Sequence, residues 1–477
     1  MSQNQAKLKN QILLNPVALF SSQYPDTGSD ERLKLGELWN QLQLLKKQTL
    51  EIQIQTKIIS RKIGEAKKIN LPTNELMHAM KQQSSERKQL EVKIGIIENQ
   101  ILDFFIIGNN KDQSITKPVI TSSSSRHTIS EVDLDTITIC LLDNEENAWN
   151  DYVSKQPAAS IHHLTHWRDI LRKTYSIDSH YLFACDKNKK IVGVLPMVRL
   201  KSRLFGDILV SMPFFQRGGA IADHPLIEHK LMKAANEEAA RLGIDHTEYR
   251  DDIPRDGLPV QSHKVNMILA LPNSEEALWA SFTAKLRAQI KRPQQLTPKV
   301  LIGGKKYLDD FYKVYSRNMR DLGSPAHSKQ LIENILTSFP DNSHIIVIRL
   351  NNKPVSAGLL LCHGNGMEIP LASTIRDYNQ HSMNMLLYWE VLKFTVNQGY
   401  NHFDFGRSSK NTGTYLFKRQ WGAQPKQLYW HYWLGNTNQL PSLNPSNPKY
   451  ALIVNIWKRL PVKLAQWLGP FIVKNIP

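Results

Sequence analysis

Cysteine and long apolar runs are both scarce in this sequence. Three of its 477 residues are cysteines, Cys140, Cys185 and Cys362, and they make neither a CxxC pair nor a Cys/His metal spacing. This pattern favours buried thiols in a reducing compartment and gives no reason to expect a metal site. No apolar run reaches the roughly 20 residues of a membrane-spanning helix. The short run before Asn15-Pro16 is unlike a signal peptide, so we expect a cytoplasmic protein.

Acidic residues are too few to balance the basic ones. The chain has 60 Lys and Arg against 43 Asp and Glu, which leaves a formal net charge of +17. Such an excess indicates an anionic partner, and RNA, a nucleotide-linked substrate and an acidic lipid surface are the three alternatives. The length suffices for about three domains of ordinary size.

The sequence repeats itself. The stretch Gly243–Tyr249 returns as Gly399–Phe405, 156 residues later, and Asn188–Leu195 is echoed by Asn352–Leu359, 164 residues later. Two similar spacings predict a duplicated domain. A cleft between two related lobes is where a small-molecule site is expected.

Short strands and helices follow one another in the same order in both copies, without a regular alternation of parallel units. The expected fold class is therefore α+β. We expect the first lobe at residues 135–270 and the second at residues 271–435.

The N-terminal part has apolar residues at alternating spacings of three and four, which predict a coiled-coil seam. The seam residues are Leu35, Leu38, Leu42, Leu45, Thr49, Ile52, Thr56, Ile59, Ile63 and Ala66. A second run from Leu76 to Phe104 has the same rhythm, and the helix-breaking stretch 70–74 predicts an antiparallel hairpin over 31–107. An extension, 1–30, precedes this arm, and a flexible polar linker is expected at 108–134.

The far end of the expected hairpin is basic. Its cations are Lys57, Arg61, Lys62, Lys67 and Lys68. They suit a nucleic acid, and the alternative is a spacer or dimerisation coiled coil with a solvated basic face. The stretch Ile59–Lys68 resembles the end of the first arm helix of seryl-tRNA synthetases, a likeness that spans about residues 30–107. In that family the arm grips tRNA, so the resemblance implies tRNA binding by these cations.

The densest polar cluster follows the second repeat. Asp404, Arg407 and Ser408 come at the end of an expected strand, and a glycine-rich segment with Gly413, Tyr415, Lys418 and Trp421 follows. Open sheets present ligands near strand ends, and the two cations suit an anion or a developing oxyanion. We predict that these residues bind substrate. The alternative is a glycine-rich turn with surface cations.

This segment, together with Leu204–Gly206 and Ser211–Phe214, resembles the Fem family of tandem GNAT-fold transferases. The likeness covers residues 135–435 and is greatest for the exosortase-associated FemAB-like branch and the BioF2-like acetyltransferase domain. It implies two GNAT-like lobes and transfer of an amino acid from aminoacyl-tRNA to the amine of a peptidoglycan precursor. It also places Lys418 where the family carries a lysine beside its reaction centre. There an ammonium stabilises charge on the acyl carbonyl.

A general base is harder to assign. Asp404 follows the strand that leads into the cluster, and it is the candidate acceptor of the amine's proton. Its counterpart in the first repeat is Glu248, and an acid at the same place in both copies is equally well explained as structural.

Two further basic segments are candidate anion clamps. In the first, helical spacing puts Arg287 and Lys291 on one face, next to Arg292. The alternative there is a solvated helix face. In the second, Arg217, Gly218 and Gly219 offer one cation and backbone amides near the presumed cleft.

The donor is expected to be aminoacyl-tRNA or an acyl-CoA, with no tightly bound cofactor. Neither lobe has a convincing copy of the Q/R-x-x-G-x-G/A pyrophosphate loop of CoA-using GNAT domains, which disfavours acetyl-CoA. The grouped histidines His162, His163 and His166 lack ligand partners at metal spacing, so capping or packing is expected for them.

The tail, residues 436–477, contains five cations and no acid. Interleaved apolar residues, including Trp457, Trp467 and Phe471, suit a membrane surface. The alternative is a tail packed over the second lobe.

Together these features predict a cytoplasmic N-acyltransferase of the Fem type, with peripheral contact at the inner membrane as a further expectation. Its acceptor is expected to be an amine of a nucleotide- or lipid-linked envelope precursor, and its arm is expected to recruit tRNA. An acyl-CoA-dependent N-acyltransferase of exopolysaccharide synthesis is the first alternative. A non-catalytic tRNA-binding scaffold, dimeric through its coiled coil, is the second.

Overall fold

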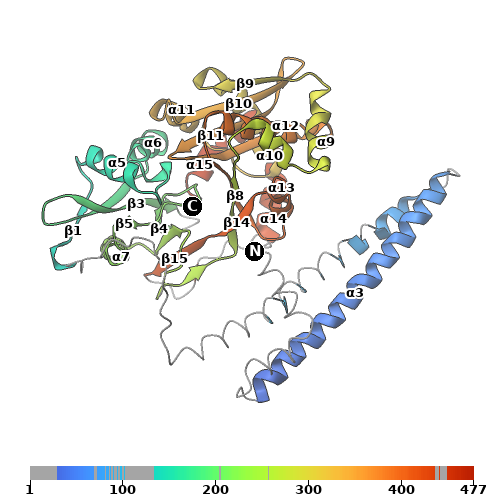
Figure 1. Ribbon diagram of the computed structural model, residues 1–477, viewed down its shortest axis with the longest axis horizontal. Helices are drawn as coiled ribbons and strands as arrows, with labels where there is room; N and C mark the ends of the chain where they lie inside the picture. The colour runs from blue at the N-terminus through green and yellow to red at the C-terminus, as the bar shows by residue number, and fades with distance from the viewer. Residues whose placement is uncertain are drawn as a thin grey trace. The chain divides into compact units, whose positions relative to one another are not determined.

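The computed structural model describes residues 29–68, parts of 72–101, and residues 134–202, 206–255, 257–435, 440 and 448–476 (Figure 1). The chain forms two compact units, residues 1–127 and 128–477. Most of the expected N-terminal extension and of the expected linker falls outside the described residues. None of the described helices is long and apolar enough to cross a bilayer.

The first unit contains one fully described helix, α3 (Ser29–Lys68). Its buried residues Leu35, Leu42 and Leu45 pack with Ile97 and Ile101. Farther along, the Thr56 hydroxyl donates to Gln83 Oε1 at 3.3 Å. Residues near the start of α3 therefore contact the end of the second segment, and residues farther along α3 contact its earlier part. The described parts of the two segments run antiparallel, and the complete hairpin stays a prediction.

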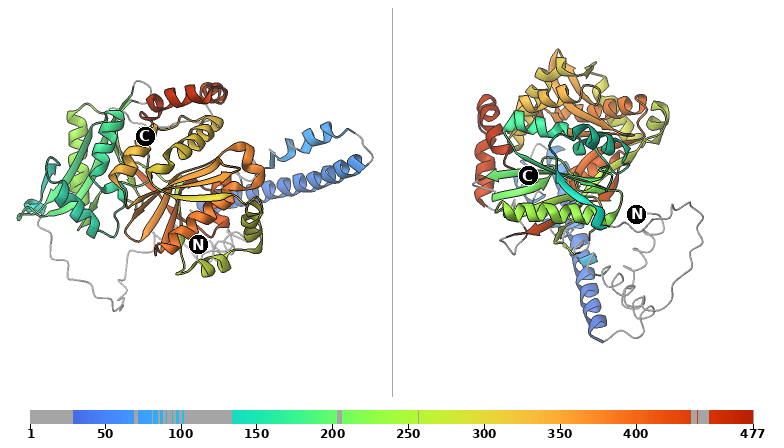
Figure 2. Two further views of the ribbon diagram at one scale, coloured as in Figure 1. Left: turned by 90° about the horizontal axis from the view of Figure 1, so that it is seen from above. Right: turned by 90° about the vertical axis from the view of Figure 1, so that its left-hand side faces the viewer.

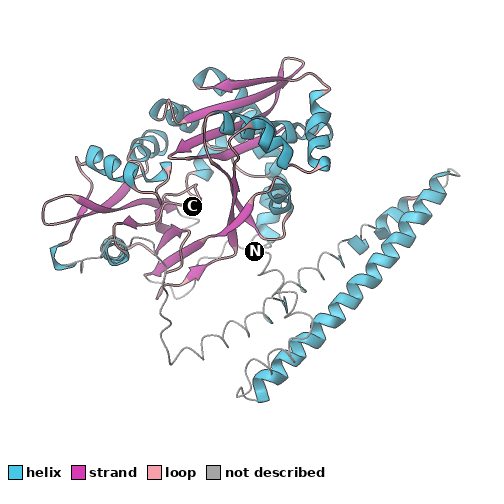
Figure 3. Ribbon diagram, in the orientation of Figure 1, coloured by secondary structure: helices cyan, strands magenta, loops and turns pink. Residues whose placement is uncertain are grey.

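The second unit is built on two mixed sheets, drawn as magenta strands in Figure 3, which confirms the α+β class. The first sheet has the spatial order β1 (Thr138–Leu141), β2 (Ser179–Cys185), β3 (Ile191–Ser202), β4 (Gly206–Ser211), β6 (His246–Asp251), β15 (Tyr429–Leu434) and β7 (Val260–Gln261), with β5 (Ile221–Ala222) beside β3. The second has the order β14 (Gln424–Gln427), β8 (Lys264–Ala270), β13 (His402–Ser409), β12 (Gly366–Thr374), β11 (Lys353–His363), β10 (Ser343–Leu350) and β9 (Lys299–Gly303).

The helices fall into two groups along the chain. Those before β8 are α5 (Glu146–Lys155), α6 (His166–Tyr175) and α7 (Pro225–Arg241). Those after it are α8 (Glu275–Ser281), α9 (Ala284–Gln294), α10 (Leu308–Leu322), α11 (Lys329–Ser338), α12 (Met383–Asn397), α13 (Gly413–Gln420), α14 (Pro448–Trp457) and α15 (Val462–Val473). Short 3-10 turns occupy Leu134–Thr136, Ile161–His163, Lys305–Tyr307 and Arg376–His381.

The predicted repeat corresponds to the same arrangement in both sheets. A helix, α7 or α12, is followed by a glycine in the left-handed region, Gly243 (φ 66°) or Gly399 (φ 82°), where a side chain would be strained. After the glycine, β6 runs parallel to β4 in the first sheet, and β13 runs parallel to β12 in the second. These parallel pairs align Val210 with Glu248 and Glu368 with Asp404. Glu368 and Asp404 are therefore neighbours across two strands.

The two sheets exchange a strand. β8 lies at the end of the predicted first lobe but pairs with β13 of the second sheet, and β15 lies at the end of the predicted second lobe but pairs with β6 of the first sheet. The boundary predicted at residues 270 and 271 therefore does not coincide with the division between the sheets. The period-two pattern of a strand specifies its faces but not its partner, which is why sequence reasoning missed the exchange.

One hydrophobic cluster joins the two lobes. Trp167 and Val194 of the first lobe belong to the same buried cluster as Ile332 and Val347 of the second. Separate clusters cover the other face of each sheet, under α7 in the first lobe and under α9 and α12 in the second. The tail helices pack against α10, as the two views of Figure 2 show for α15. The lobes are thus held together by a shared core.

Candidate active site

The site is centred on an irregularity in β13. The register between β13 and β8 shifts between Asp404 and Arg407, and Gly406 there has φ 75°. The Asp404 carboxylate accepts hydrogen bonds from Asn266 Nδ2 at 2.5 Å and from the Gly406 backbone N–H at 2.6 Å. Burial raises the pKa of Asp404, and the Arg217 guanidinium opposes that rise. Asp404 is therefore a buried carboxyl with raised proton affinity, as a general base requires.

The Lys418 side chain contacts the same irregularity in β13. It lies on α13, a short helix capped by Thr412, and only 9% of the residue is exposed. Its Nζ donates to the carbonyl oxygens of Gly406 at 3.0 Å and Arg407 at 2.9 Å. An ammonium has three donors, so one remains that no described residue engages. Burial lowers the pKa of Lys418 to about 8, against the opposing effect of the Asp404 carboxylate.

Asp404 lines a cavity of about 680 Å³. The cavity walls come from the end of α5 and the following loop, from Arg217, from the turn between β11 and β12, and from the start of β13. Glu368 is a further lining residue. The cavity therefore lies between the two lobes, where the duplication predicts a site, and its lining includes two carboxyls and one guanidinium.

Glu368 and His162 were missed by the sequence reasoning. His162 Nε2 lies 2.8 Å from Glu368 Oε1, and both residues are buried. Burial by itself would raise the pKa of Glu368, but His162, Arg217 and His363 together hold it below its ordinary value. Glu368 is thus an ionised neighbour of Asp404. The contact between Glu368 and Asp404 follows from the pairing of β12 with β13, which becomes apparent only when the two strands are aligned.

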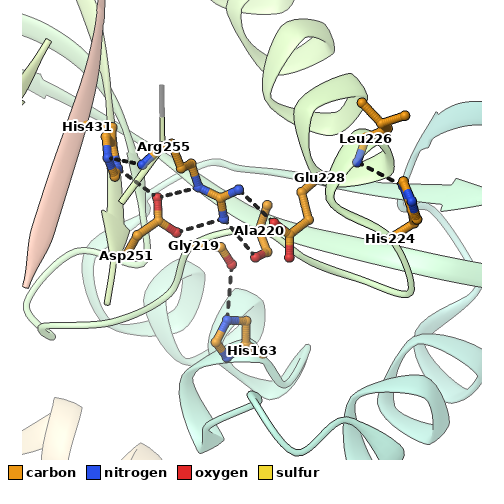
Figure 4. A network of polar contacts seen from close by, with 9 residues as sticks. All are labelled: His163, Gly219, Ala220, His224, Leu226, Glu228, Asp251, Arg255 and His431. Atoms are coloured by element: carbon orange, nitrogen blue, oxygen red, sulfur yellow. Dashed lines mark hydrogen bonds and ion pairs between the residues drawn. The ribbon is translucent and has the colours of Figure 1, made fainter. Parts of the chain in front are cut away.

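Arg217 lies on a loop that is anchored from several directions. Its Nη1 is 3.3 Å from Asp252 Oδ2. Figure 4 shows the anchor, in which Arg255 binds Asp251 and Glu228 and donates to the Ala220 carbonyl at 3.3 Å. The remaining contacts drawn there are His163 Nε2 to Gly219 O at 3.1 Å, His431 to Asp251 and Arg255, and His224 to Leu226 N. The predicted cation is therefore held at the cavity.

The amides of Gly218 and Gly219 were expected to face an anion, and this expectation is wrong. Both N–H groups donate to the Arg250 carbonyl at 3.1 Å. A Cβ on Gly218 would lie 2.4 Å from Met212 Cβ, and one on Gly219 would lie 1.8 Å from Asp251 Oδ1. The two glycines permit close packing of the loop against β6, which leaves their amides unavailable to a ligand.

We expect Gly218→Ala to lower the free energy of unfolding by about 1–3 kcal/mol, because the backbone and Met212 must move to admit the methyl group. Urea unfolding measures this change. Gly413→Ala is the matched control, since a Cβ there has no neighbour within 4 Å, and its effect should stay within about 0.5 kcal/mol. Equal stability of the two variants would contradict the packing role.

Glu248, the counterpart of Asp404, has a different role. It accepts from Arg250 Nε at 2.7 Å and from the Tyr432 hydroxyl at 3.0 Å. The Arg250 guanidinium lies 4.4 Å from the centre of the Trp430 ring, and the exposed Arg407 lies 4.9 Å from it. Two arginines therefore share one indole, which favours an anion beside Arg407. Glu248, the acid of the first repeat, therefore forms an ion pair with Arg250.

Several other predicted substrate-binding residues lie elsewhere. Trp421 is 1% exposed and packs against Phe282, so it belongs to the core. Arg287 donates to the Phe282 carbonyl at 2.6 Å, at the end of α8, and so does not form a free anion clamp. Lys291 lies 5.9 Å from the Trp279 ring centre. None of the three predicted cations on α9, Arg287, Lys291 and Arg292, lines the cavity.

The remaining predicted residues lie close to the irregularity along the chain. Ser408 is buried, and its hydroxyl has no hydrogen-bond partner among the described residues. Gly413 and Tyr415 begin α13, with Tyr415 half-buried.

In the arm, Arg61 pairs with Glu65 at 3.2 Å. Within the described ranges, no three His, Cys, Asp or Glu side chains are grouped to hold a metal ion.

Comparison with known proteins places part of the chain in a known domain family. Residues 280–419 match the family described as "Acetyltransferase (GNAT) domain". The solved structure of FemX is similar over 66% of this chain and 99% of its own, with 13% identity and a TM-score of 0.50. The C-terminal domain of a putative lysylphosphatidylglycerol synthetase from Agrobacterium fabrum is 13% identical, with a TM-score of 0.44 over 61% of this chain and 92% of that one. No curated protein sequence matches this chain.

The matched stretch runs from the end of α8 to α13 and includes both Asp404 and Lys418. The prediction that the chain is an acyltransferase is confirmed at the level of this domain. The likeness to FemX extends the shared fold over both lobes, in agreement with a Fem-like, tandem arrangement.

Proposed function

We propose that the protein is a Fem-type N-acyltransferase that transfers an aminoacyl group from aminoacyl-tRNA to an amine of a cell-envelope precursor. The observation that carries this proposal is the arrangement around Gly406. There the buried Asp404 carboxyl accepts from the Gly406 amide, and the Lys418 ammonium donates to the Gly406 carbonyl. A base and an oxyanion-stabilising cation thus share one turn of backbone.

The acceptor amine enters from the cavity. Asn401, His402 and Asp404 line it at the start of β13, whereas Lys418 contacts the later residues of that strand. Asp404 therefore lines the cavity, and Lys418 contacts the backbone two and three residues farther along the same strand. In the cavity, the carboxylates of Glu368 and Asp404 attract the acceptor as its ammonium ion, and Arg217 limits their mutual repulsion. The ammonium ion gives one proton to solvent, and the neutral amine is the nucleophile.

The chemistry is an aminolysis of an ester. The amine nitrogen attacks the acyl carbonyl carbon, and Asp404 takes the proton that the amine loses. The negative charge that develops on the carbonyl oxygen is stabilised by the free donor of Lys418. When the intermediate collapses, the C–O bond to the ribose breaks, and Asp404 returns the proton to the leaving oxygen. An amide and a free tRNA result.

The donor side is basic, as an aminoacyl-tRNA requires. Arg407 is exposed beside Trp430 and Arg250, and a phosphate or a terminal base suits a guanidinium stacked on an indole. In the arm, the cations at the far end of α3 supply a second contact to the tRNA backbone. The hairpin arrangement and this contact are parts of the proposal.

A second candidate is an acyl-CoA-dependent N-acyltransferase, favoured by the match to an acetyltransferase domain. The same Asp404 and Lys418 chemistry would apply to a thioester. The two candidates differ in the donor, so a binding experiment separates them.

We expect the full-length protein to bind aminoacyl-tRNA and not acetyl-CoA. A variant with Lys57, Arg61, Lys62, Lys67 and Lys68 replaced by glutamine should bind tRNA at least about tenfold more weakly at roughly 150 mM salt. Its salt slope should fall by about 1 for each phosphate that is no longer neutralised. Filter binding or fluorescence titration at two salt concentrations measures both quantities.

The control for charge alone replaces Lys285, Lys291, Lys305, Lys353 and Arg419 by glutamine, which lowers the net charge equally outside the arm. Equal losses of affinity in the two variants would show non-specific attraction. Acetyl-CoA binding that is indifferent to the arm substitutions would favour the acyl-CoA enzyme, with the arm as a spacer or dimer interface. Binding of tRNA without any acyl transfer would favour a scaffold.

A further inference from the structure

The C-terminal helices α14 and α15 lie on the second lobe through one face. Trp457 Nε1 donates to the Ser324 carbonyl at 3.0 Å, and Gln466 Nε2 donates to Ser316 Oγ at 2.8 Å. Gly469 lies so close to Ala326 that a Cβ would come within 2.8 Å of its carbonyl oxygen. These contacts attach the tail firmly to α10 and the loop after it, so the orientation of the other face is fixed.

The other face of the tail is apolar and open. Trp467 is 64% exposed and Phe471 is 59% exposed, and their rings contact one another one helical turn apart at 6.0 Å. The remaining exposed apolar residues of the tail are Ile453, Ile456, Leu464 and Ile472. We call these six residues the apolar face. Because α15 is anchored, these two aromatic side chains are held in solvent. Exposed apolar side chains of this size indicate an interaction surface.

The charge around this face has one sign. Lys463 lies on α15, Lys458 and Arg459 lie between α14 and α15, and Lys474 follows the end of α15. The sequence of residues 436–477 contains no acid. A second copy of this chain would place like charges against each other, which is unfavourable. A surface of uniform negative charge above an apolar layer is the partner that fits cations and aromatics together.

We propose that α14 and α15 bind the protein to the surface of an anionic lipid bilayer. The apolar face enters the boundary between headgroups and acyl chains, where indole rings are favoured, and the four cations meet lipid phosphates. At 10 and 12 residues the helices would span about 15–18 Å, well short of the roughly 30 Å hydrocarbon core, so they lie on the bilayer and do not cross it.

This attachment has a consequence that rests on the proposed function. An enzyme held on a bilayer meets acceptors that are themselves anchored in it, so the amine would belong to a lipid-linked precursor. The binding itself does not depend on that function, and each can fail without the other.

The test is sedimentation of the full-length protein with vesicles of phosphatidylcholine alone and of phosphatidylcholine with about 30% phosphatidylglycerol. We expect binding to the anionic vesicles and a blue shift of tryptophan fluorescence. The double substitution Trp467→Ser and Phe471→Ser should weaken this binding by about 100-fold, and replacement of Lys458, Arg459 and Lys463 by glutamine should weaken it about fivefold per cation.

Two controls make the result specific. Leu141→Ser with Leu226→Ser removes two exposed apolar side chains elsewhere on the second unit and should leave vesicle binding unchanged. The five glutamine substitutions in the arm should also leave most of the binding intact, which separates the tail from the other basic region. Transfer to a water-soluble amine should be the same with and without Trp467 and Phe471.

Vesicle binding that is unaffected by the Trp467 and Phe471 substitutions would overturn the proposal. It would also be overturned if the unsubstituted protein were a dimer that these substitutions dissociate while vesicle binding persisted, because the apolar face would then join two copies. Loss of transfer in every variant, with tail-dependent vesicle binding preserved, would reject the proposed function and retain the membrane contact.

Discussion

Replacing Lys418 by methionine should lower kcat by about 10²–10³-fold while the protein remains folded. The ammonium is held by the Gly406 and Arg407 carbonyls, and its remaining donor is available to a carbonyl oxygen that becomes negative only in the transition state. Because that interaction is absent in the ground state, KM should change little. Single-turnover kinetics with a charged tRNA donor and a soluble amine measure the effect.

Arg419→Met is the matched control for Lys418→Met. Arg419 is the next residue on α13, it is exposed, and its guanidinium is 6.0 Å from the Tyr415 ring centre. Its loss removes an equal charge and should reduce the rate by less than about threefold. Unchanged turnover after Lys418→Met would remove the catalytic assignment, and equal losses at both positions would indicate a general effect of charge on α13.

The second large effect is expected from Asp404→Asn, which should lower kcat by about 10²–10⁴-fold because an amide cannot accept the amine's proton. The substitution should be tolerated by the fold. Asn266 now donates to Asp404 through Nδ2, and its Oδ1 is buried without a hydrogen-bond partner among the described residues. If the Asn266 amide turns over, Oδ1 accepts from the new amide, and the Gly406 N–H keeps its acceptor.

The pH dependence of kcat distinguishes a general base at Asp404 from a carboxyl that only stabilises the fold. Because burial raises the pKa of Asp404, the acidic limb should lie above the ordinary carboxyl value of about 4, and activity should rise as Asp404 loses its proton. As pH increases through about 8, Lys418 loses its proton and activity should fall.

Each limb of this profile has its own control. Lys418→Arg should move the alkaline limb upward, because arginine stays charged. An acidic limb that survives Asp404→Asn would belong to another group, and Glu368 would be the first to examine.

The parts of the site that sequence reasoning predicted are those encoded locally. Asp404 was predicted from its place at the end of an expected strand, and Lys418 from the resemblance to the Fem family. The two residues are fourteen positions apart, so the chain itself keeps them near the same irregularity. The repeat was visible because the left-handed turns at Gly243 and Gly399 require glycine after each helix. The expected packing role of the grouped histidines agrees with the burial of His162 and His163.

The parts that were missed depend on contacts between distant segments. Glu368 is an ordinary strand residue until β12 is aligned with β13. Arg287 and Trp421 have the composition of a binding site, but their partners are Phe282 and the helix end before it. For the tail, binding to a membrane surface and packing over the second lobe were alternatives in the sequence. The contacts with α10 and the loop after it agree with packing, and membrane contact stays a prediction.

The exchange of β8 and β15 makes each half of the duplication depend on the other for its fold. Either half alone would form a sheet without one of its strands, and the backbone groups of β6 or β13 would be exposed to pairing with other chains. The two copies remain free to diverge in chemistry, as Glu248 and Asp404 have done. Neither can complete its own sheet without the other.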